Sequence, residues 1–364
     1  LNPAGAQVVL KSLIENMLIE SRNYEITVQT LFNKGEIINQ LPSEVHYKSI
    51  IRVKNNFLEK ICAYLIRRVL PPSITHRLFI KGDYDYEVAF LEGECTRLIS
   101  ASSSQSKKIA WVHINLMKHF TSQGLYKSIK EHRDVYDKFD NIICVSNGCR
   151  EGFCERFPDI EKNKVKIINN IIHQPSIIRK STLTNPERTS TELQFVCVGN
   201  MRQQKGYDRL LLVLSQLKNE GFKFHFWILG DGSEFKKIQN LLINYDLANY
   251  VKLLGSINNP YPYIAASDAL VLSSYEEGYS TVAIESTLLG VPVITTDCCG
   301  MDEIFDNGKY AIVCPNTKEG IYNSLKNVLK NPKLLEEYKK IIPERWEYFS
   351  SNSIMSQIKT LLCK

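Results

Sequence analysis

Short apolar runs alternate with amphipathic stretches along nearly the whole chain. The apolar runs predict strands at 24–30, 86–91, 108–112, 141–145, 194–198, 223–229, 251–254, 269–272 and 291–295. Between them, apolar residues recur with helical spacing, for example over 208–219 and 234–244. Strands that alternate with helices in this way indicate βαβ units and a parallel sheet. The pattern therefore predicts an α/β fold.

The clearest break in the pattern is a polar segment at 180–192, KSTLTNPERTSTE, which has no apolar periodicity. A chain of 364 residues exceeds the roughly 100–200 residues of a typical domain, so we expect two domains, 1–180 and 193–340, with a linker at 181–192. Open α/β sheets bind ligands beyond the carboxyl ends of their strands. Candidate site residues should therefore follow strands directly.

Composition excludes several classes of protein. Hydrophobic residues make up 44% of the chain and charged residues 23%, which is ordinary for a soluble globular protein. No apolar run approaches the roughly 18 residues of a transmembrane helix. The ten cysteines form no CxxC pair, so we predict reduced thiols in a cytoplasmic protein and no metal site. We expect no secretory signal near Leu1.

The positive charge is concentrated in the first half, where residues 1–180 hold 26 Lys and Arg against 19 Asp and Glu. Such an excess suits an anionic partner, such as a membrane surface, a phosphorylated substrate or nucleic acid. The segment 57–70 mixes apolar and basic residues and can form an amphipathic helix on an anionic membrane. Alternatively, it packs its apolar face on the sheet. Five cations lie in or just before it: Arg52, Lys54, Lys60, Arg67 and Arg68.

The most informative segment is SYEEGYSTVAIE at 274–285, where a strand runs into a loop that opens a helix near Ser280. The free N–H groups of 279–282 and the helix dipole favour an anion there, and a diphosphate fits. Glu285 should reach back towards the loop that carries Glu277, since helical side chains lean towards the N-terminus. Two such carboxylates would bind sugar or ribose hydroxyls; alternatively, both are ordinary surface charges.

Other candidate residues follow other predicted strands. In GNMRQQKG at 199–206, Gly199 lets the backbone approach a phosphate and Lys205 supplies a flexible positive charge. His113 directly follows the strand at 108–112.

These segments together resemble the retaining GT-B glycosyltransferases of family 4 (glycosyltransferase group 1), of the bacterial polysaccharide-biosynthesis type. The resemblance is dense over 195–313. It rests on a Glu-x7-Glu signature at 277–285, a GRLxxxKG-like loop at 199–206, a GxG turn at 230–232, a GxPVIxTD strand at 290–297 and the GGxxE residues Gly300 and Glu303. Asn200 stands where the family has Arg, and Arg202 can supply that charge from the same loop.

The first half resembles the family more weakly. The segment 1–10 is similar to the GGAERVL loop and first helix, and the strand that precedes that helix would be expected upstream of Leu1. Gly5 would then contact the diphosphate or the acceptor, although an ordinary helix-start glycine is equally consistent. WVHIN at 111–115 resembles a WxHxD element whose His lies near the transferred sugar, with Asn115 in place of the acid.

The resemblance implies two Rossmann-like doubly wound domains that face a central cleft, with 341–364 as a C-terminal helix that crosses back to the N-terminal domain. It implies transfer of a sugar from a nucleotide diphosphate sugar, with a UDP-sugar expected, to a sugar or lipid-linked glycan acceptor in capsule or other cell-surface polysaccharide synthesis. No cofactor, metal or nucleic acid is expected. We expect a cytoplasmic protein that is peripheral on the inner face of an anionic membrane.

The implied site has three sets of residues. Glu277, His113 and Lys205 are the predicted catalytic residues. The predicted donor-binding residues are Gly199, Asn200, Arg202, Lys205, Gly230, Gly232, Ser274, Gly278, Tyr279, Ser280, Thr281, Val282 and Glu285. The predicted acceptor-binding residues are Gly5, His113 and Asn115. A sugar-nucleotide epimerase or a phosphorylase of the same fold, or a non-catalytic nucleotide-binding subunit, are the alternatives.

Overall fold

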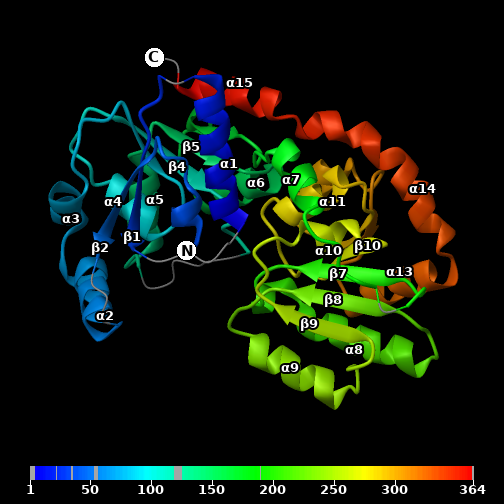
Figure 1. The fold of residues 1–364 in the computed structure, drawn as a ribbon. Coiled ribbons are helices and arrows are strands. Elements are labelled where there is room, and N and C mark those ends of the chain that lie inside the picture. Colours follow the sequence, from blue (N-terminus) through cyan, green and yellow to red (C-terminus); the bar gives the residue numbers. More distant parts are fainter. Residues whose placement is uncertain are drawn as a thin grey trace. The chain divides into compact units, whose positions relative to one another are not determined.

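The computed structural model describes residues 5–21, 23–33, 36–52, 56–118, 125–188 and 190–362. The chain forms two compact units, drawn in Figure 1: unit 1 is Leu1–Ile171 with Asn352–Lys364, and unit 2 is Ile172–Ser351. The division falls before the polar segment that was expected to be the linker. The reason is that helix α7 (Gln174–Ser181) packs against α10 (Tyr261–Ala265) and α11 (Thr281–Leu288) of unit 2, so the polar segment also belongs to unit 2.

Unit 1 is built on a parallel sheet of four strands in the order β3-β4-β5-β6, with a separate parallel pair β1-β2. The strands are β1 (Thr27–Phe32), β2 (His46–Ile51), β3 (Tyr86–Ala89), β4 (Lys107–Val112), β5 (Asn141–Cys144) and β6 (Val165–Ile167). The pattern predicted β1, β3, β4 and β5, with ends that differ by a few residues. It did not predict β2 or β6.

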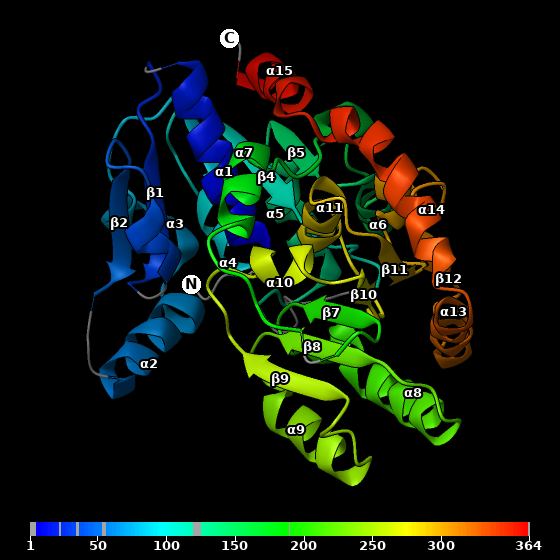
Figure 2. The ribbon, with the colours of Figure 1, turned by 45° about the vertical axis from the view of Figure 1, so that its right-hand side comes forward.

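The helices of unit 1 are α1 (Gly5–Glu20), α2 (Asn56–Tyr64), α3 (Pro72–Phe79), α4 (Glu94–Ile99), α5 (Ile129–Asp137) and α6 (Asn147–Arg156), with a π-helical turn η2 (Leu65–Val69) and 3-10 turns η1 (Glu36–Gln40) and η3 (Lys162–Lys164). The C-terminal helix α15 (Ser351–Leu362) lies beside α1 in both Figure 1 and Figure 2. Lys359 pairs with Glu20 at 3.0 Å, and the Tyr86 hydroxyl donates to the Leu362 carbonyl at 2.6 Å.

Unit 2 is a doubly wound parallel sheet of six strands in the order β12-β11-β10-β7-β8-β9. The strands are β7 (Gln194–Val198), β8 (His225–Leu229), β9 (Val251–Gly255), β10 (Ala269–Leu272), β11 (Val293–Thr296) and β12 (Ile312–Cys314). Its helices are α7, α8 (Tyr207–Asn219), α9 (Phe235–Asn244), α10 (Tyr261–Ala265), α11 (Thr281–Leu288), α12 (Met301–Phe305), α13 (Lys318–Lys330) and α14 (Lys333–Ile341), with 3-10 turns η4 (Gln203–Lys205) and η5 (Ile342–Phe349). Of the strands, only β12 was not predicted.

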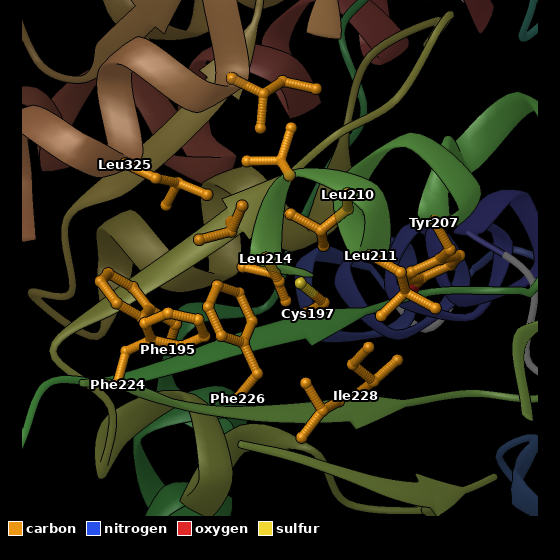
Figure 3. Packing of buried hydrophobic residues seen from close by; sticks show 14 of the residues in the cluster. Phe195, Cys197, Tyr207, Leu210, Leu211, Leu214, Phe224, Phe226, Ile228 and Leu325 are labelled. Atoms are coloured by element: carbon orange, nitrogen blue, oxygen red, sulfur yellow. The ribbon is translucent and has the colours of Figure 1, made fainter. Parts of the chain in front are cut away.

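The core of unit 2 lies between its sheet and α8, as Figure 3 shows. Leu210 and Leu214 of α8 pack over Phe195 and Phe226 of the neighbouring strands β7 and β8, and all four side chains are fully buried. The rings of Phe195 and Phe226 are stacked at 4.9 Å. This packing fixes the start of α8, and with it the loop that joins β7 to α8, against the sheet.

Candidate active site

The candidate site of unit 2 lies where the strand order reverses. Strands β7 and β10 are hydrogen-bonded neighbours, with Phe195 beside Ala269, although they are far apart in the sequence. The loop after β7 leads to α8, next to β8, whereas the loop after β10 leads to α11, next to β11. Such a switch point leaves a crevice at the carboxyl ends of the strands, which is the usual ligand site of an open α/β sheet.

Glycines bring the backbones of these loops into direct contact. Gly199 and Gly230 have φ values of 157° and 146°, and a Cβ on Gly230 would lie 2.0 Å from the Gly199 carbonyl oxygen. A Cβ on Gly232 would lie 2.5 Å from the Met201 carbonyl oxygen. These predicted donor-binding glycines therefore let the loops after β7 and β8 pack without side chains between them.

The centre of the site is an ion pair between two predicted catalytic residues. Lys205 Nζ lies 2.7 and 2.9 Å from the two carboxylate oxygens of Glu277, and the Ser274 hydroxyl donates to Glu277 Oε1 at 2.6 Å. The Glu277 side chain is 7% exposed and that of Lys205 is 20% exposed. This ion pair thus links the loop after β7, which carries Lys205, to the loop after β10, which carries Glu277. The Lys205 side chain therefore keeps some contact with solvent, whereas Glu277 is almost fully buried.

Arg209 is a residue of this region that the sequence reasoning missed. Its guanidinium is buried and donates to the backbone carbonyls of Ser273 and Ser274 at 2.8 and 2.7 Å. It also donates to Asn316 Oδ1 at 2.7 Å and lies 3.9 Å from the centre of the Tyr275 ring. Arg209 therefore fixes the course of the loop that carries Glu277. The sequence signal that could have identified Arg209 was its position four residues after Lys205.

The start of helix α11 follows this loop. Ser280 is its N-cap, and its hydroxyl accepts the Ala283 N–H at 3.4 Å. The N–H groups of the first turn have no acceptor within the helix, so this end favours an anion. A Cβ on Gly300 would lie 2.6 Å from the Gly278 carbonyl oxygen. Gly300 therefore lets the loop after β11 pack against the loop after β10, which carries Gly278. Tyr279 is buried, and burial raises its pKa well above the usual range.

Glu285 is buried on α11 and has different neighbours from Glu277. Burial raises the pKa of its carboxyl to about 7, while the charge of Lys180 and a hydrogen bond from Tyr261 act in the opposite direction. These neighbours come from α7 and α10. Lys205 and Ser274, by contrast, hold Glu277.

The remaining donor-loop residues of unit 2 differ in their exposure. The Arg202 side chain is exposed, and its N–H donates to the Asn200 carbonyl at 2.9 Å. This tight turn keeps Arg202 in the loop that carries Lys205. Thr281 is half-buried and Val282 is buried in the first turn of α11.

His113 of unit 1 follows β4, as predicted. Its ring packs against Phe90 with centroids 5.0 Å apart, and Nε2 lies 3.0 Å from the Phe90 carbonyl oxygen. Burial lowers the pKa of His113 to about 4, so the imidazole is neutral at pH 7. Because the Phe90 carbonyl can only accept, Nε2 carries the proton and Nδ1 is left to accept a hydrogen bond from a bound hydroxyl.

Glu92 holds the backbone of His113, and the sequence reasoning missed it. Its carboxylate accepts the N–H groups of His113 and Ile114, the latter at 3.2 Å. Burial raises its pKa to about 7. Glu92 lies shortly after β3, so the same rule that selected His113, a polar residue following a strand, could have found it.

Asn115 and Gly5 have local roles in the structure. Asn115 Oδ1 accepts the Met117 N–H at 2.9 Å, and its Nδ2 donates to the Gly148 carbonyl at 2.8 Å, so the side chain braces the loop after β4. Gly5 is the exposed first residue of α1. The predicted loop residues before it lie outside the described residues. In the described part of the chain, no group of three or more His, Cys, Asp or Glu residues is placed to hold a metal ion.

Comparison with known proteins confirms the resemblance to group 1 glycosyltransferases. Residues 180–345 match the family model described as Glycosyl transferases group 1. An uncharacterized glycosyltransferase of Methanocaldococcus jannaschii is 30% identical over 258 residues, 65% of this chain and 63% of that protein. The N-acetylgalactosamine-N,N'-diacetylbacillosaminyl-diphospho-undecaprenol 4-alpha-N-acetylgalactosaminyltransferase of Campylobacter jejuni is 28% identical over 223 residues, 60% of this chain and 59% of that protein. The chain thus spans less than two thirds of the length of these relatives.

Solved structures confirm the α/β GT-B fold. HepE of Anabaena, crystallised with UDP and glucose, has a TM-score of 0.72 at 18% identity, covering 99% of this chain and 96% of that one. A glycosyltransferase of Rickettsia africae has a TM-score of 0.69 at 16% identity, with the same coverage.

Proposed function

We propose that this chain, whose residues 180–345 form a group 1 glycosyl transferase domain, is a retaining glycosyltransferase that needs no metal ion. It would move a sugar from a UDP-sugar to a lipid-linked glycan acceptor in cell-surface polysaccharide synthesis. The observation that carries the proposal is the cluster of Lys205, Glu277 and Ser274 at the strand switch point. The UDP of the HepE crystals and the undecaprenol-linked acceptor in the name of the Campylobacter relative support the choice of substrates.

The donor diphosphate would bind at the start of α11 and draw Lys205 partly away from Glu277. Arg202, Lys205 and the N–H groups of 279–282 would then stabilise the charge that develops on the leaving diphosphate, and such electrostatic terms are usually the largest in catalysis. Glu277, relieved of part of its ion pair, would accept hydroxyls of the donor sugar. Glu285 would accept the ribose hydroxyls.

Transfer would occur on the face of the sugar from which the diphosphate leaves. The bond from the sugar C1 to the diphosphate oxygen breaks, the bond from C1 to the acceptor oxygen forms, and the acceptor proton moves to the departing diphosphate. Neutral His113 would hold a hydroxyl of the transferred sugar through a hydrogen bond. We further propose that unit 1 binds the acceptor and that the enzyme works in the cytoplasm at the inner face of a membrane.

The test measures UDP release from a panel of UDP-sugars with and without lipid-linked acceptors. Lys205→Ala should lower kcat/KM about 10- to 100-fold, because a charge-assisted contact worth roughly 1.5–3 kcal/mol is lost. Glu277→Gln should lower turnover by about 100-fold or more. It should leave UDP affinity unchanged or tighter, because Lys205 no longer has a competing carboxylate.

A matched control is Lys237→Ala, since Lys237 also pairs with a glutamate at 2.7 Å but is half exposed on α9. It should leave kcat/KM unchanged. Acceptor-independent conversion of the donor sugar would instead identify an epimerase. UDP binding without turnover of any donor would identify a non-catalytic subunit.

A further inference from the structure

Unit 1 contains a cavity that the proposed transfer reaction does not use. Its volume is about 810 Å³, within the roughly 300–1,000 Å³ that is typical of ligand pockets. Helix α4 contacts both α3 and α5 (Figure 1), and residues of these three helices line the cavity. We call it the α4–α5 cavity, after the segments 97–102 and 128–138 that provide most of its lining.

The α4–α5 cavity is separate from the predicted acceptor residues. Lys108 lies at the amino end of β4, and Lys138 comes just before the amino end of β5. His113 and Asn115, by contrast, follow the carboxyl end of β4. None of the residues that line the cavity belongs to the predicted catalytic, donor-binding or acceptor-binding sets. A ligand in this cavity would therefore occupy a second site.

The lining is mostly polar and carries excess positive charge. Its cationic side chains outnumber its carboxylates by four to two. The cations are those of Arg97, Lys108, Lys130 and Lys138. The carboxylates are those of Glu131 and Asp134 on α5.

Groups outside the cavity engage both carboxylates. Asp134 Oδ1 pairs with Arg133 at 3.1 Å, and Arg133 does not line the cavity. Glu131 Oε2 accepts the backbone N–H of Lys127 at 2.5 Å. The two acids are therefore partly neutralised from outside and do not cancel the charge of the cations that line the cavity.

The cations of the cavity have no acidic partner in the part of the chain that the structure describes. There, no residue forms an ion pair or hydrogen bond with the ammonium of Lys108, Lys130 or Lys138. The Arg97 guanidinium donates to a neutral acceptor, the Arg67 carbonyl, at 2.8 Å. Positive charge gathered in a concave site attracts an anion.

The cavity also offers hydrogen-bond acceptors. Ser100 lines it and is 5% exposed. Its hydroxyl donates to the Arg97 carbonyl at 3.1 Å, so its lone pairs can accept from a ligand. Glu131 Oε1 and Asp134 Oδ2 accept from no described residue. A ligand that has hydroxyls as well as an anionic group can therefore use both kinds of contact.

A buried network behind the cavity fixes two parts of its wall. Glu87 of β3 is 5% exposed, and its Oε1 accepts the hydroxyls of Ser102, which lines the cavity, and Ser106, each at 2.7 Å. Glu87 Oε2 lies 2.5 Å from Nε2 of His76 on α3, the helix whose first residues line the cavity. Burial acts to raise the pKa of Glu87, but hydrogen bonds from the serines and His76 outweigh it and lower the pKa. The wall is thus held in place before any ligand binds, which lowers the entropy cost of binding.

We propose that the α4–α5 cavity binds a soluble phosphorylated sugar. Arg97, Lys108 and Lys138 would donate to the phosphate, and the free oxygens of Glu131 and Asp134 would accept the sugar hydroxyls. A bare inorganic anion is a poorer occupant, because the cavity is much larger than phosphate and the carboxylates would repel it. An apolar molecule would leave the charged lining without partners. The inference does not rest on the proposed function, because it uses none of the residues of the transfer site.

The experiment is isothermal titration calorimetry of the full chain with glucose 6-phosphate and glucose 1-phosphate. Saturating UDP is present, to keep both probes out of the proposed donor site. At least one sugar phosphate should bind about tenfold or more tightly than inorganic phosphate or glucose, each of which lacks one kind of contact. Lys108→Gln with Lys138→Gln should weaken that binding at least about tenfold, because charge-assisted hydrogen bonds are lost.

A matched control is Lys107→Gln with Lys166→Gln. Both lysines are exposed on strands of the same sheet, β4 and β6, and neither lines the cavity. This variant removes the same charge and should leave the Kd for the sugar phosphate unchanged. Lys205→Ala should also leave that Kd unchanged. The cavity variant should keep its affinity for UDP, so the two proposals can fail separately.

The inference is wrong if neither sugar phosphate binds, or if the cavity and control variants bind it alike. Inorganic phosphate that binds as tightly as the sugar phosphate would reduce the cavity to a general anion site and contradict the role of the sugar hydroxyls. Displacement of the sugar phosphate by a short-chain lipid-linked sugar diphosphate would assign the cavity to the acceptor instead.

Discussion

Glu285 has a folded-state pKa of about 7, well above the usual value of 4.5, because it is buried. A carboxyl with a raised pKa holds its proton longer in the folded protein than in the unfolded chain. Its contribution to stability is therefore greatest below about pH 4.5 and is lost as the pH rises through 7. The ionised form, which accepts hydroxyls best, thus becomes available only around neutral pH.

This titration predicts a pH-dependent nucleotide affinity. If Glu285 binds the ribose, the affinity for UDP should rise several-fold between pH 6 and pH 8 as the carboxyl ionises. Glu285→Gln should bind UDP more weakly at pH 8 and should lack this added slope. Isothermal titration calorimetry at several pH values measures both, and the variant corrects for the titration of UDP itself. Identical slopes in wild type and Glu285→Gln would exclude the ribose role.

At the residue scale, the sequence singled out candidate polar residues but not the contacts that hold their loops in place. Lys205, Ser274 and Glu277, which the sequence singled out one by one, lie in contact, because strong strand patterns and glycine loops place them at one sheet edge. Arg209 and Glu92 were missed since each acts on backbone groups of another segment. Such contacts depend on the three-dimensional course of loops, which no local spacing records.

At the scale of elements, the close approach of the loops after β7 and β8 depends on Gly230. Gly230→Ala would place a Cβ against the Gly199 carbonyl at a strained φ of 146°. We expect a loss of more than about 2 kcal/mol of unfolding free energy and loss of UDP binding, because the loop after β7 must move. Gly221→Ala is the control: its φ is 86°, but a Cβ there meets nothing within 4 Å. It should cost about 1–2 kcal/mol and keep UDP affinity. Chemical denaturation of both variants measures the unfolding free energy, and UDP titration measures the affinity for UDP.

The strands differ in how well a sequence pattern predicts them. Strands β7 and β10 match their predicted bounds because they are continuous apolar runs buried in the middle of the sheet. Strands β6 and β12 have only three residues each and lie at sheet edges, so they carry too little periodicity. Strand β2, HYKSII, mixes polar and apolar residues because its burial is only partial.

At the scale of the whole molecule, the chain does not divide into units in simple sequence order. Residues from Asn352 onwards join unit 1, although everything from Ile172 to Ser351 belongs to unit 2. The basic excess of 1–180 falls mostly within unit 1. The division between the units falls before the expected linker, because α7, with its buried Ile177, packs against other helices of unit 2.

The placement of α15 predicts that a change near the C-terminus weakens the N-terminal half. Ile358 is 2% exposed in α15, so Ile358→Ala should remove about 2–5 kcal/mol from the stability of unit 1 through the cavity it leaves. Gln357→Ala, at an exposed position of the same helix, should change the stability of unit 1 little.

Trp111 is the only tryptophan of unit 1, because Trp227 and Trp346 lie in unit 2. In a background with both unit 2 tryptophans replaced by Phe, fluorescence therefore follows the unfolding of unit 1. The increase in the melting temperature on adding UDP reports on unit 2, and it should persist in Ile358→Ala. A loss of the UDP effect with an unchanged Trp111 transition would show that α15 supports unit 2 instead.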